Sequence, residues 1–236
     1  MDTTSAIEDS TVSHSGCGGI LTTGGDGRTL RPGNLAVRRN KVHHTSLWKR
    51  SYAPPLGFWG CGNTYEGNYV GFVPHSGIIG NGVNMSFTGN TLESNCFETS
   101  DVSAAAPSAS SSASSDKAAA QVGAFYTDGE IGDRGNKGDN FWSGRGSRII
   151  NNTFINIRTD YPGSKGDLAV QAVYLDDMIS GYEVASNRFV NCSVGSFVGG
   201  GRDTSVHDNY YENCDLAQHF DNVRTCSLDL CTVSLA

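Results

Sequence analysis

The stretch Val184-Ala-Ser-Asn-Arg-Phe189 is followed 22 residues later by Val206-His-Asp-Asn-Tyr-Tyr211. Both fit one phrase: an apolar residue, two variable residues, an asparagine, one variable residue and a second apolar residue. The phrase also occurs at four earlier places, which are Val37–Val42, Tyr65–Val70, Phe87–Leu92 and Ile149–Phe154. A weaker copy, Ile7–Val12, has Ser10 where the asparagine would be. Such self-similarity predicts a stack of similar structural units.

The spacing of the repeats indicates strand-built coils. The asparagines lie 28, 22, 62, 35 and 22 residues apart, so the longer intervals contain the shortest unit plus an insertion or an extra coil. Apolar residues alternate with polar ones and are interrupted by Gly, Asn and Asp, which favours short strands over amphipathic helices. We therefore predict an all-β fold, a right-handed parallel β-helix of roughly 22-residue coils, incomplete at both ends.

The repeated asparagine suits the bends of such a solenoid. Each coil would lie about 4.8 Å from the preceding one and bury an apolar face that a single coil could not bury. Asparagine tolerates left-handed backbone geometry, and its side-chain amide can bond to the same group one coil away. We therefore expect an asparagine ladder along the axis.

Length and composition are consistent with one elongated domain. The chain has 236 residues, of which 37% are apolar and 30 are glycine, enough for a narrow core with tight turns. We expect a single domain over residues 1–223 and an irregular tail over residues 224–236. The Ser/Ala-rich residues 102–120 contain too little apolar bulk to order themselves, so we expect a disordered loop there.

Charge and hydropathy restrict the partners. The net charge of −7 comes without a basic stripe, which argues against nucleic acid. The chain contains no run of 18 apolar residues that could span a membrane, and the N-terminal Met1–Thr4 lacks the features of a signal peptide. Because Ile7 already lies in repeat phase without a polar cap, we expect this chain to be an internal portion of a longer protein or the product of a gene model cut short. We expect it to be a monomer.

Two of the seven cysteines occupy equivalent positions. Cys192 and Cys214 each lie five residues after a repeat asparagine, which would stack them in one column. Stacking would allow a disulfide, but buried thiols that act as small apolar groups are the interpretation we favour. No cysteine pair has the spacing of a zinc site.

A second set of segments aligns aspartates. The segments are Gly123–Asp128, Gln171–Asp176, Val194–Gly199 and Leu216–Asp221. Their last residues form one column, and the column two positions earlier contains Tyr126, Tyr174, Phe197 and His219. Asp176 and Asp221 would then lie two coils apart, roughly 9 to 10 Å between backbones, with an open notch at Gly199–Gly201.

Paired carboxylates on one wall point to sugar chemistry. Glycoside hydrolysis uses two carboxyl groups about 5 Å apart for retention of configuration and about 6.5 to 9.5 Å apart for inversion. Stacked carboxylates repel one another, so we expect a solenoid to keep them only where they serve a function. The alternative is that these aspartates cap turns or bind calcium. We expect no other cofactor and no other metal.

Several motifs follow one another over residues 7–222: Gly16-Cys-Gly-Gly19, Pro74-His-Ser76, Glu98-Thr-Ser-Asp101, Gly123-Ala-Phe-Tyr-Thr127, Val173-Tyr-Leu-Asp-Asp177, Gly199-Gly-Gly-Arg-Asp203 and His219-Phe-Asp-Asn222. This series resembles that of right-handed β-helix proteins of carbohydrate metabolism, and most of all the α-L-fucosidase/xylanase-like group of β-helix glycoside hydrolases. The resemblance implies a carbohydrate substrate and an extracellular or secretory location.

The resemblance also implies catalytic roles. One catalytic aspartate would belong to the pair Asp176 and Asp177. The second would follow Tyr126, where the family usually has Tyr-x-Gly-Arg-Asp-Trp, but this chain has Thr-Asp-Gly-Glu after Tyr126. An Asp-Asn-Phe-Trp stretch occurs only at Asp139–Trp142, so Asp128 and Asp139 both remain candidates.

Other residues on the same wall are candidates for substrate binding. Arg202 could pair with the aspartates or bond to a sugar hydroxyl, or instead form a salt bridge with Asp203. His75 lies on a coil turn, where it could orient a carboxylate or serve only a structural role. Aromatic surfaces at Trp48, Trp59 and Trp142 could stack on sugar rings or pack against loops. Tyr126, Tyr174, His219 and Asp221 complete the candidate set.

Two other functions fit the same fold. A polysaccharide lyase would use a Lys or Arg base, often with calcium, but the candidate face is rich in Asp and poor in Lys. A non-catalytic scaffold or adhesin would use its aspartates only as turn caps. A lyase would release products that absorb ultraviolet light. For a scaffold or adhesin, replacing Asp176 and Asp177 by asparagine would leave every measurable property nearly unchanged.

Overall fold

The computed structural model describes residues 5–97, 122–128, 144–159, 170–221 and 225–227, and within these residues it contains β-strands and no helix. The all-β prediction is therefore confirmed. In this part of the chain no helix is long and apolar enough to cross a membrane.

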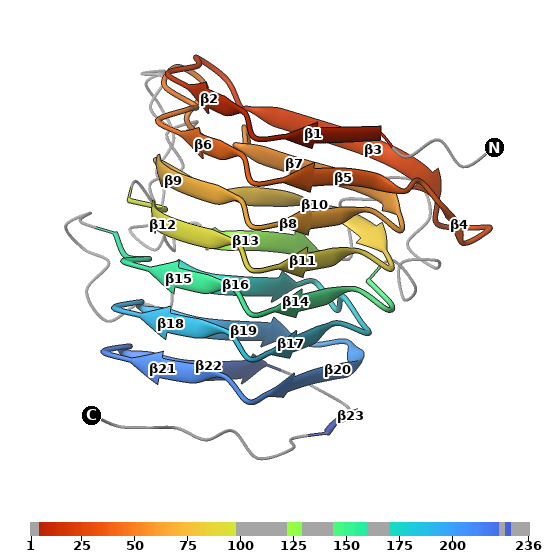
Figure 1. Ribbon diagram of the computed structural model, residues 1–236. Helices are drawn as coiled ribbons and strands as arrows, with labels where there is room; N and C mark the ends of the chain where they lie inside the picture. The colour runs from red at the N-terminus through yellow and green to blue at the C-terminus, as the bar shows by residue number, and fades with distance from the viewer. Residues whose placement is uncertain (1–4, 98–121, 129–143, 160–169, 222–224, 228–236) are drawn as a thin grey trace, which may run out of the picture.

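The strands form three sheets along the molecule (Figure 1). Sheet A contains β1 (Ser5–Glu8), β5 (Leu35–Arg38), β8 (Thr64–Glu66), β11 (Ser86–Thr88), β14 (Arg148–Ile150), β17 (Glu183–Ala185), β20 (Arg202–His207) and β23 (Thr225–Ser227). Sheet B contains β2 (Thr11–Ser13), β6 (Lys41–His43), β9 (Tyr69–Val73), β12 (Thr91–Asn95), β15 (Thr153–Ile155), β18 (Arg188–Val190) and β21 (Tyr210–Glu212). Sheet C contains β3 (Ile20–Asp26), β7 (Leu56–Cys61), β10 (Ile78–Val83), β13 (Val122–Asp128), β16 (Val170–Asp176), β19 (Val194–Gly199) and β22 (Leu216–Asp221), with the short β4 (Arg31–Pro32) at its edge.

The chain visits the three sheets in turn, so each coil adds one strand to each sheet. Pairing between successive coils is parallel throughout, and among the described strands only the β3–β4 hairpin is antiparallel. Figure 1 shows the coils piled from the N-terminal end at the top to the C-terminal end at the bottom. The arrangement is solenoid-like and compatible with a parallel β-helix.

The long interval between Asn90 and Asn152 is a single coil with insertions. Strand β11 pairs directly with β14, and Phe87 lies opposite Ile149, so no extra coil intervenes. The stretch 102–120, expected to be a disordered loop, lies outside the described residues. Residues 225–227, within the expected tail, form β23 and pair with β20.

The asparagine ladder is present. Each Asn Nδ2 donates to Oδ1 of the next asparagine, over 3.1, 2.9, 2.9, 3.1 and 3.0 Å from Asn40 through Asn68, Asn90, Asn152 and Asn187 to Asn209. The same Oδ1 atoms accept the backbone N–H of the preceding ladder residue. At the first coil the backbone N–H of Ser10 donates to Asn40 Oδ1 over 3.1 Å, as the weaker repeat predicts.

The expected left-handed geometry of these asparagines is wrong by one position. None of the six ladder asparagines has a positive φ; the residue before each of them does. These preceding residues are Arg39, Gly67, Gly89, Asn151, Ser186 and Asp208, with φ between 53° and 66°. The turn therefore bends just before the asparagine, which leaves the asparagine free to direct its amide into the stack.

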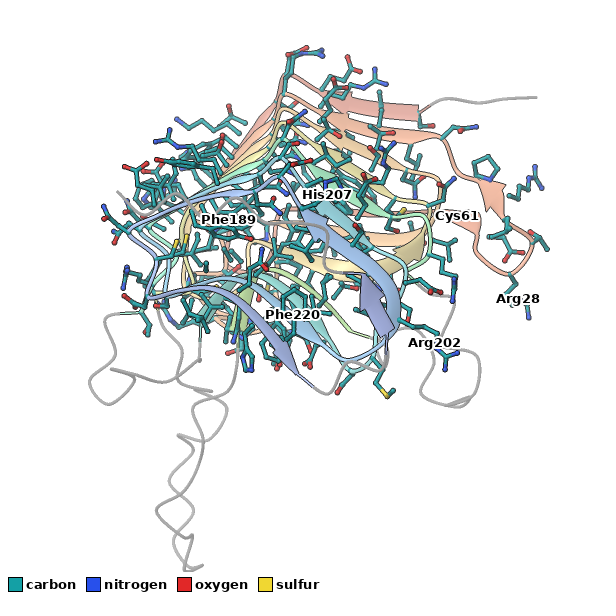
Figure 2. The ribbon with its side chains drawn as sticks, turned by 90° about the horizontal axis from the view of Figure 1, so that it is seen from below. Arg28, Cys61, Phe189, Arg202, His207 and Phe220 are labelled. Atoms are coloured by element: carbon teal, nitrogen blue, oxygen red, sulfur yellow. The ribbon has the colours of Figure 1, made fainter. Side chains whose placement is uncertain are left out.

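The apolar positions of the repeat fill the interior. Phe154, Phe189 and Tyr211 stack nearly parallel in successive coils, with ring centroids 5.0 and 4.8 Å apart. Phe189 is fully buried and lies inside the coil in Figure 2, which looks along the stack. Burying one such side chain contributes about 1.5–3 kcal/mol, so repetition of the phrase builds the core.

A second left-handed column follows sheet B and is formed by several residue types. It contains His14, His44, Phe72, Ser94, Asn156, Asn191 and Asn213, each with a positive φ. The next residue of each coil turns back toward the interior, and Cys192 and Cys214 occupy this position in the last two coils.

We expect Asn90→Asp to lower the free energy of unfolding by about 3 kcal/mol or more, because it removes a buried donor and places a charge in the ladder. Asn90 Nδ2 serves both Asn152 Oδ1 and the carbonyl of Tyr65. Urea denaturation measures the change. The matched control is Asn84→Asp at an exposed left-handed turn, which should cost under about 0.5 kcal/mol. Equal losses at the two positions would contradict the ladder's role.

Candidate functional site

The outer face of sheet C carries the candidate site. Side chains alternate along each strand, so Val173 and Leu175 of β16 enter the core while Tyr174 and Asp176 lie on the opposite face. The same alternation holds in β13 and β19, which pair with β16 on either side. A shift of one residue between these strands would therefore change which side chains of neighbouring coils meet on this face.

The strand register places the aligned aspartates in one column. Asp128 pairs with Asp176, and Gly199 pairs with Asp221. Leu175 pairs with Val198, so Gly199 follows in the register of Asp176. We call this set, with Asn81 in the preceding coil, the aspartate column; Asn81 lies two residues after Ile79, which pairs with Tyr126. Asn81 was not among the residues predicted to form this column.

A second column consists of aromatic rings packed edge to face. Tyr126, Tyr174, Phe197 and His219 lie in one register. Their ring centroids are 5.2, 4.9 and 4.7 Å apart in sequence order. Tyr174 and Phe197 are buried, whereas Tyr126 and His219 are half-buried. Of the predicted sugar-binding rings on this column, only Tyr126 and His219 therefore retain exposed surface.

The half-buried carboxylate of Asp176 is held by several donors. Tyr126 Oη donates to Asp176 Oδ2 over 3.3 Å, and the Tyr174 phenol also bonds to this carboxylate. The backbone N–H of Asp177 donates to Oδ1 over 2.8 Å. Asp176 is thus partly a turn cap, as the alternative interpretation expects, and at the same time the acceptor for one phenol from the neighbouring coil and one from its own strand.

The phenol of Tyr174 has a raised pKa. Burial is the largest cause, followed by the negative charge of Asp176 and the hydrogen bond to it. Asp177 and the nearby Tyr52 add to the effect. Tyr174 therefore stays protonated and acts as a donor to Asp176.

Asp177 lies at a tight turn after β16. Asp177 and Met178 both have positive φ, 44° and 62°, and both are exposed. Met178 N–H donates to the carbonyl of Gly199 over 3.0 Å, which attaches this turn to the next coil. The Asp177 carboxyl is therefore accessible to solvent one residue from Asp176.

His75 and Tyr52 pack together near the same face. Their ring centroids are 4.7 Å apart, His75 is buried and Tyr52 is half exposed. His75 was a predicted binding residue, whereas Tyr52 was not. Tyr52 belongs to the connection between β6 and β7, which does not follow the repeat. Its position near the site could therefore not be predicted from the repeat and is known only from its contacts in the structure.

Arg202 and Asp203 begin β20 beyond the glycine notch. Asp203 pairs with Arg145 of the neighbouring connection over 2.7 Å, an ion pair that the sequence did not suggest. Both Arg202 and Asp203 are exposed, and Figure 2 shows Arg202 at the outside of the coil. Gly201 has φ of 81°, and a Cβ there would collide with the carbonyl of Ile179, so this glycine is required by packing.

The remaining candidates are only partly described. Asp139 and Trp142 lie outside the described residues, and for Asp128 and Asp221 the structure describes the backbone register alone. Trp48 is 88% exposed with its ring across Gly16, in the first coils. Among the described residues no group of three or more His, Cys, Asp or Glu side chains could hold a metal ion.

No protein-family model, curated protein or solved structure matches this chain. The resemblance to β-helix glycoside hydrolases therefore stays a hypothesis based on short motifs. The all-strand, parallel architecture is compatible with it.

We expect Asp176→Asn to lower the pKa of Tyr174 toward its ordinary range, because the substitution removes the negative charge and leaves burial as the main perturbation. The tyrosine Cζ chemical shift followed against pH measures this, with Tyr174→Phe assigning the resonance. Asp208→Asn, on the turn between sheets A and B, is the matched control and should leave the titration unchanged. An unchanged Tyr174 titration in Asp176→Asn would contradict the contact.

Proposed function

We propose that the solenoid is a right-handed parallel β-helix that acts as a glycoside hydrolase on a polysaccharide or glycan. The observation that supports this most is the Asp176 carboxylate on the outer face of sheet C, which accepts hydrogen bonds from phenols of two coils. A glycan substrate and a secretory location belong to the same proposal, as does the absence of nucleic acid and membrane partners.

Asp176 is the group we assign as base or nucleophile. A carboxylate that accepts several hydrogen bonds is held in one orientation. A general acid must carry a proton and reach the leaving oxygen, so it requires a different carboxyl group. The exposed Asp177 and the column members Asp128 and Asp221 are the candidates for this role, together with Asp139.

The spacing of the column relates the choice of partner to stereochemistry. Adjacent coils lie about 4.8 Å apart, which suits the roughly 5 Å separation of a retaining enzyme if Asp128 is the partner of Asp176. Asp221 lies two coils from Asp176, which suits the wider separation of an inverting enzyme. The anomer released first from a substrate, observed by proton NMR, distinguishes the two pairings.

Substrate binding is assigned to residues around this carboxylate. Gly199 lies beside it, since a Cβ there would be 3.4 Å from Asp176 Oδ1, but the same Cβ would be 2.8 Å from the Phe197 ring, so the position admits no larger residue. Arg202, Asp203 and His219 lie on the coils that follow, and Asp177 and Tyr126 retain accessible surface. These groups supply the donors and acceptors that sugar hydroxyls require.

The test is hydrolysis of a panel of polysaccharides and aryl glycosides by the full chain, followed as reducing ends. Release of products that absorb ultraviolet light would indicate the lyase alternative instead. A chain that binds glycans without cleaving any member of the panel would support the non-catalytic scaffold.

We expect Asp176→Asn or Asp177→Asn to reduce kcat by at least about a hundredfold, because loss of a general acid or base has this scale. Circular dichroism should show that both variants remain folded. The exposed Asp208→Asn is the control and should retain full activity. Full activity in both Asp176→Asn and Asp177→Asn would exclude this assignment.

We expect Tyr126→Phe to reduce kcat about tenfold without changing the thermal midpoint by more than a few degrees. The phenol is a donor to a charged group, worth about 1.5–3 kcal/mol, and its loss leaves Asp176 less well oriented. Tyr210→Phe, on the exposed face of sheet B, is the matched control. A kcat equal to that of the control would show that this hydrogen bond has no part in catalysis.

A further inference from the structure

Two thiols meet at the end of sheet B in the last two coils. Cys192 and Cys214 occupy equivalent positions, two residues after Val190 and Glu212, which pair in register. The backbone N–H of Asp215 donates to the carbonyl of Cys192 over 3.1 Å, so the two turns are directly adjacent. The strand spacing of about 4.8 Å lies within the Cα separation that a disulfide permits.

The two thiols have different surroundings. Both are free, Cys192 is fully buried, and Cys214 is half-buried at the edge of the core. They hydrogen-bond to each other, and each Sγ lies 3.7 Å from a carbonyl oxygen of the preceding coil. Cys214 is thus the thiol that a reagent can reach, and Cys192 lies behind it.

Arg158 places a positive charge beside this pair. Its guanidinium donates to the carbonyls of Cys192 and Asn213 over 3.2 and 2.9 Å, and it forms an ion pair with Asp215 at 2.7 Å. Arg158 therefore binds both cysteine turns at once. A guanidinium held in this place favours a thiolate nearby.

The thiol pKa values move in opposite directions. The hydrogen bond from Cys192 is the main cause that lowers the pKa of Cys214 to about 7, and Arg158 contributes. Burial raises the pKa of Cys192. Near neutral pH the accessible sulfur is therefore the nucleophile and the buried sulfur keeps its proton.

We propose that Cys214 and Cys192 are a reactive thiol pair that a small-molecule disulfide converts into a disulfide between coils. The Cys214 thiolate attacks one sulfur of the reagent, which forms a mixed disulfide and expels one thiolate. The Cys192 sulfur then attacks Cys214 Sγ, loses its proton and expels the second reagent thiol. One disulfide bond is consumed and one is formed, so the reagent is reduced as the protein is oxidised.

The bond would tie the seventh coil to the sixth. The 21 residues between the cysteines include β19, β20 and β21, and β22 with His219 follows Cys214. We therefore expect slower amide hydrogen exchange in β21 and β22 of the oxidised protein. This inference does not depend on the proposed hydrolase activity.

The experiment treats the full chain with oxidised glutathione at neutral pH and maps disulfides by peptide mass spectrometry. Wild type should give a peptide pair joined through Cys192 and Cys214, lighter by two hydrogen atoms. Cys192→Ser should instead stop at a glutathione adduct on Cys214. The buried Cys96, whose thiol pKa is raised by burial, is the internal control and should remain unmodified.

A second measurement addresses reactivity without relying on a variant that could fail to fold. The rate of Cys214 alkylation by iodoacetamide in wild type should rise at a lower pH than that of an ordinary cysteine thiol, since Cys192 and Arg158 lower the pKa of Cys214. Equal glutathione adducts on Cys214 in wild type and Cys192→Ser would overturn the proposal. So would a disulfide joining Cys214 to any other cysteine, or no reaction at Cys214.

Discussion

The buried asparagine amide is the group on which the register of this protein depends. Each amide lies in the interior of the stack and needs two donors and an acceptor satisfied there, which only the equivalent asparagine and a carbonyl of the neighbouring coil provide. A slip of one residue between two coils would leave these groups unpaired and would turn the apolar face of every strand outward. Correct stacking is therefore strongly favoured over its nearest alternatives, and the aromatic stack of Phe154, Phe189 and Tyr211 reinforces it.

The same register creates the candidate site. Tyr126 and Asp176 are 50 residues apart in sequence, yet they meet because β13 and β16 pair in register. Tyr174 reaches the same carboxylate from its own strand, and burial keeps its phenol protonated. The thiol pair depends on this alignment too, since β18 and β21 bring Cys192 beside Cys214. Both the carboxylate site and the thiol pair thus form because equivalent positions of successive coils lie next to each other, whatever reaction the carboxylates perform.

Features that repeat were accessible from the sequence, and features confined to one turn were not. The ladder, the aspartate column and the stacked cysteines all follow from one periodic phrase. The left-handed residue was predicted at the asparagine and lies one position before it. Both positions tolerate turns, and only the backbone geometry shows which of the two has a positive φ. Two contacts join connections of irregular length: the ion pair between Arg145 and Asp203, and the packing of Tyr52 on His75. The sequence contains no periodic pattern that would align these connections.

The sequence by itself determined that the chain is built of strands, which residues face inward, and which positions stack, because a repeated apolar pattern has few ways to bury itself. Only the tertiary structure decided how the stacked groups interact. It made Asp176 the acceptor of two phenols, buried Tyr174 while leaving Asp177 exposed, and put Arg158 between two cysteine turns. These outcomes depend on side-chain direction and on loops that cover the sheet, and such contacts carry no periodic signal along the chain.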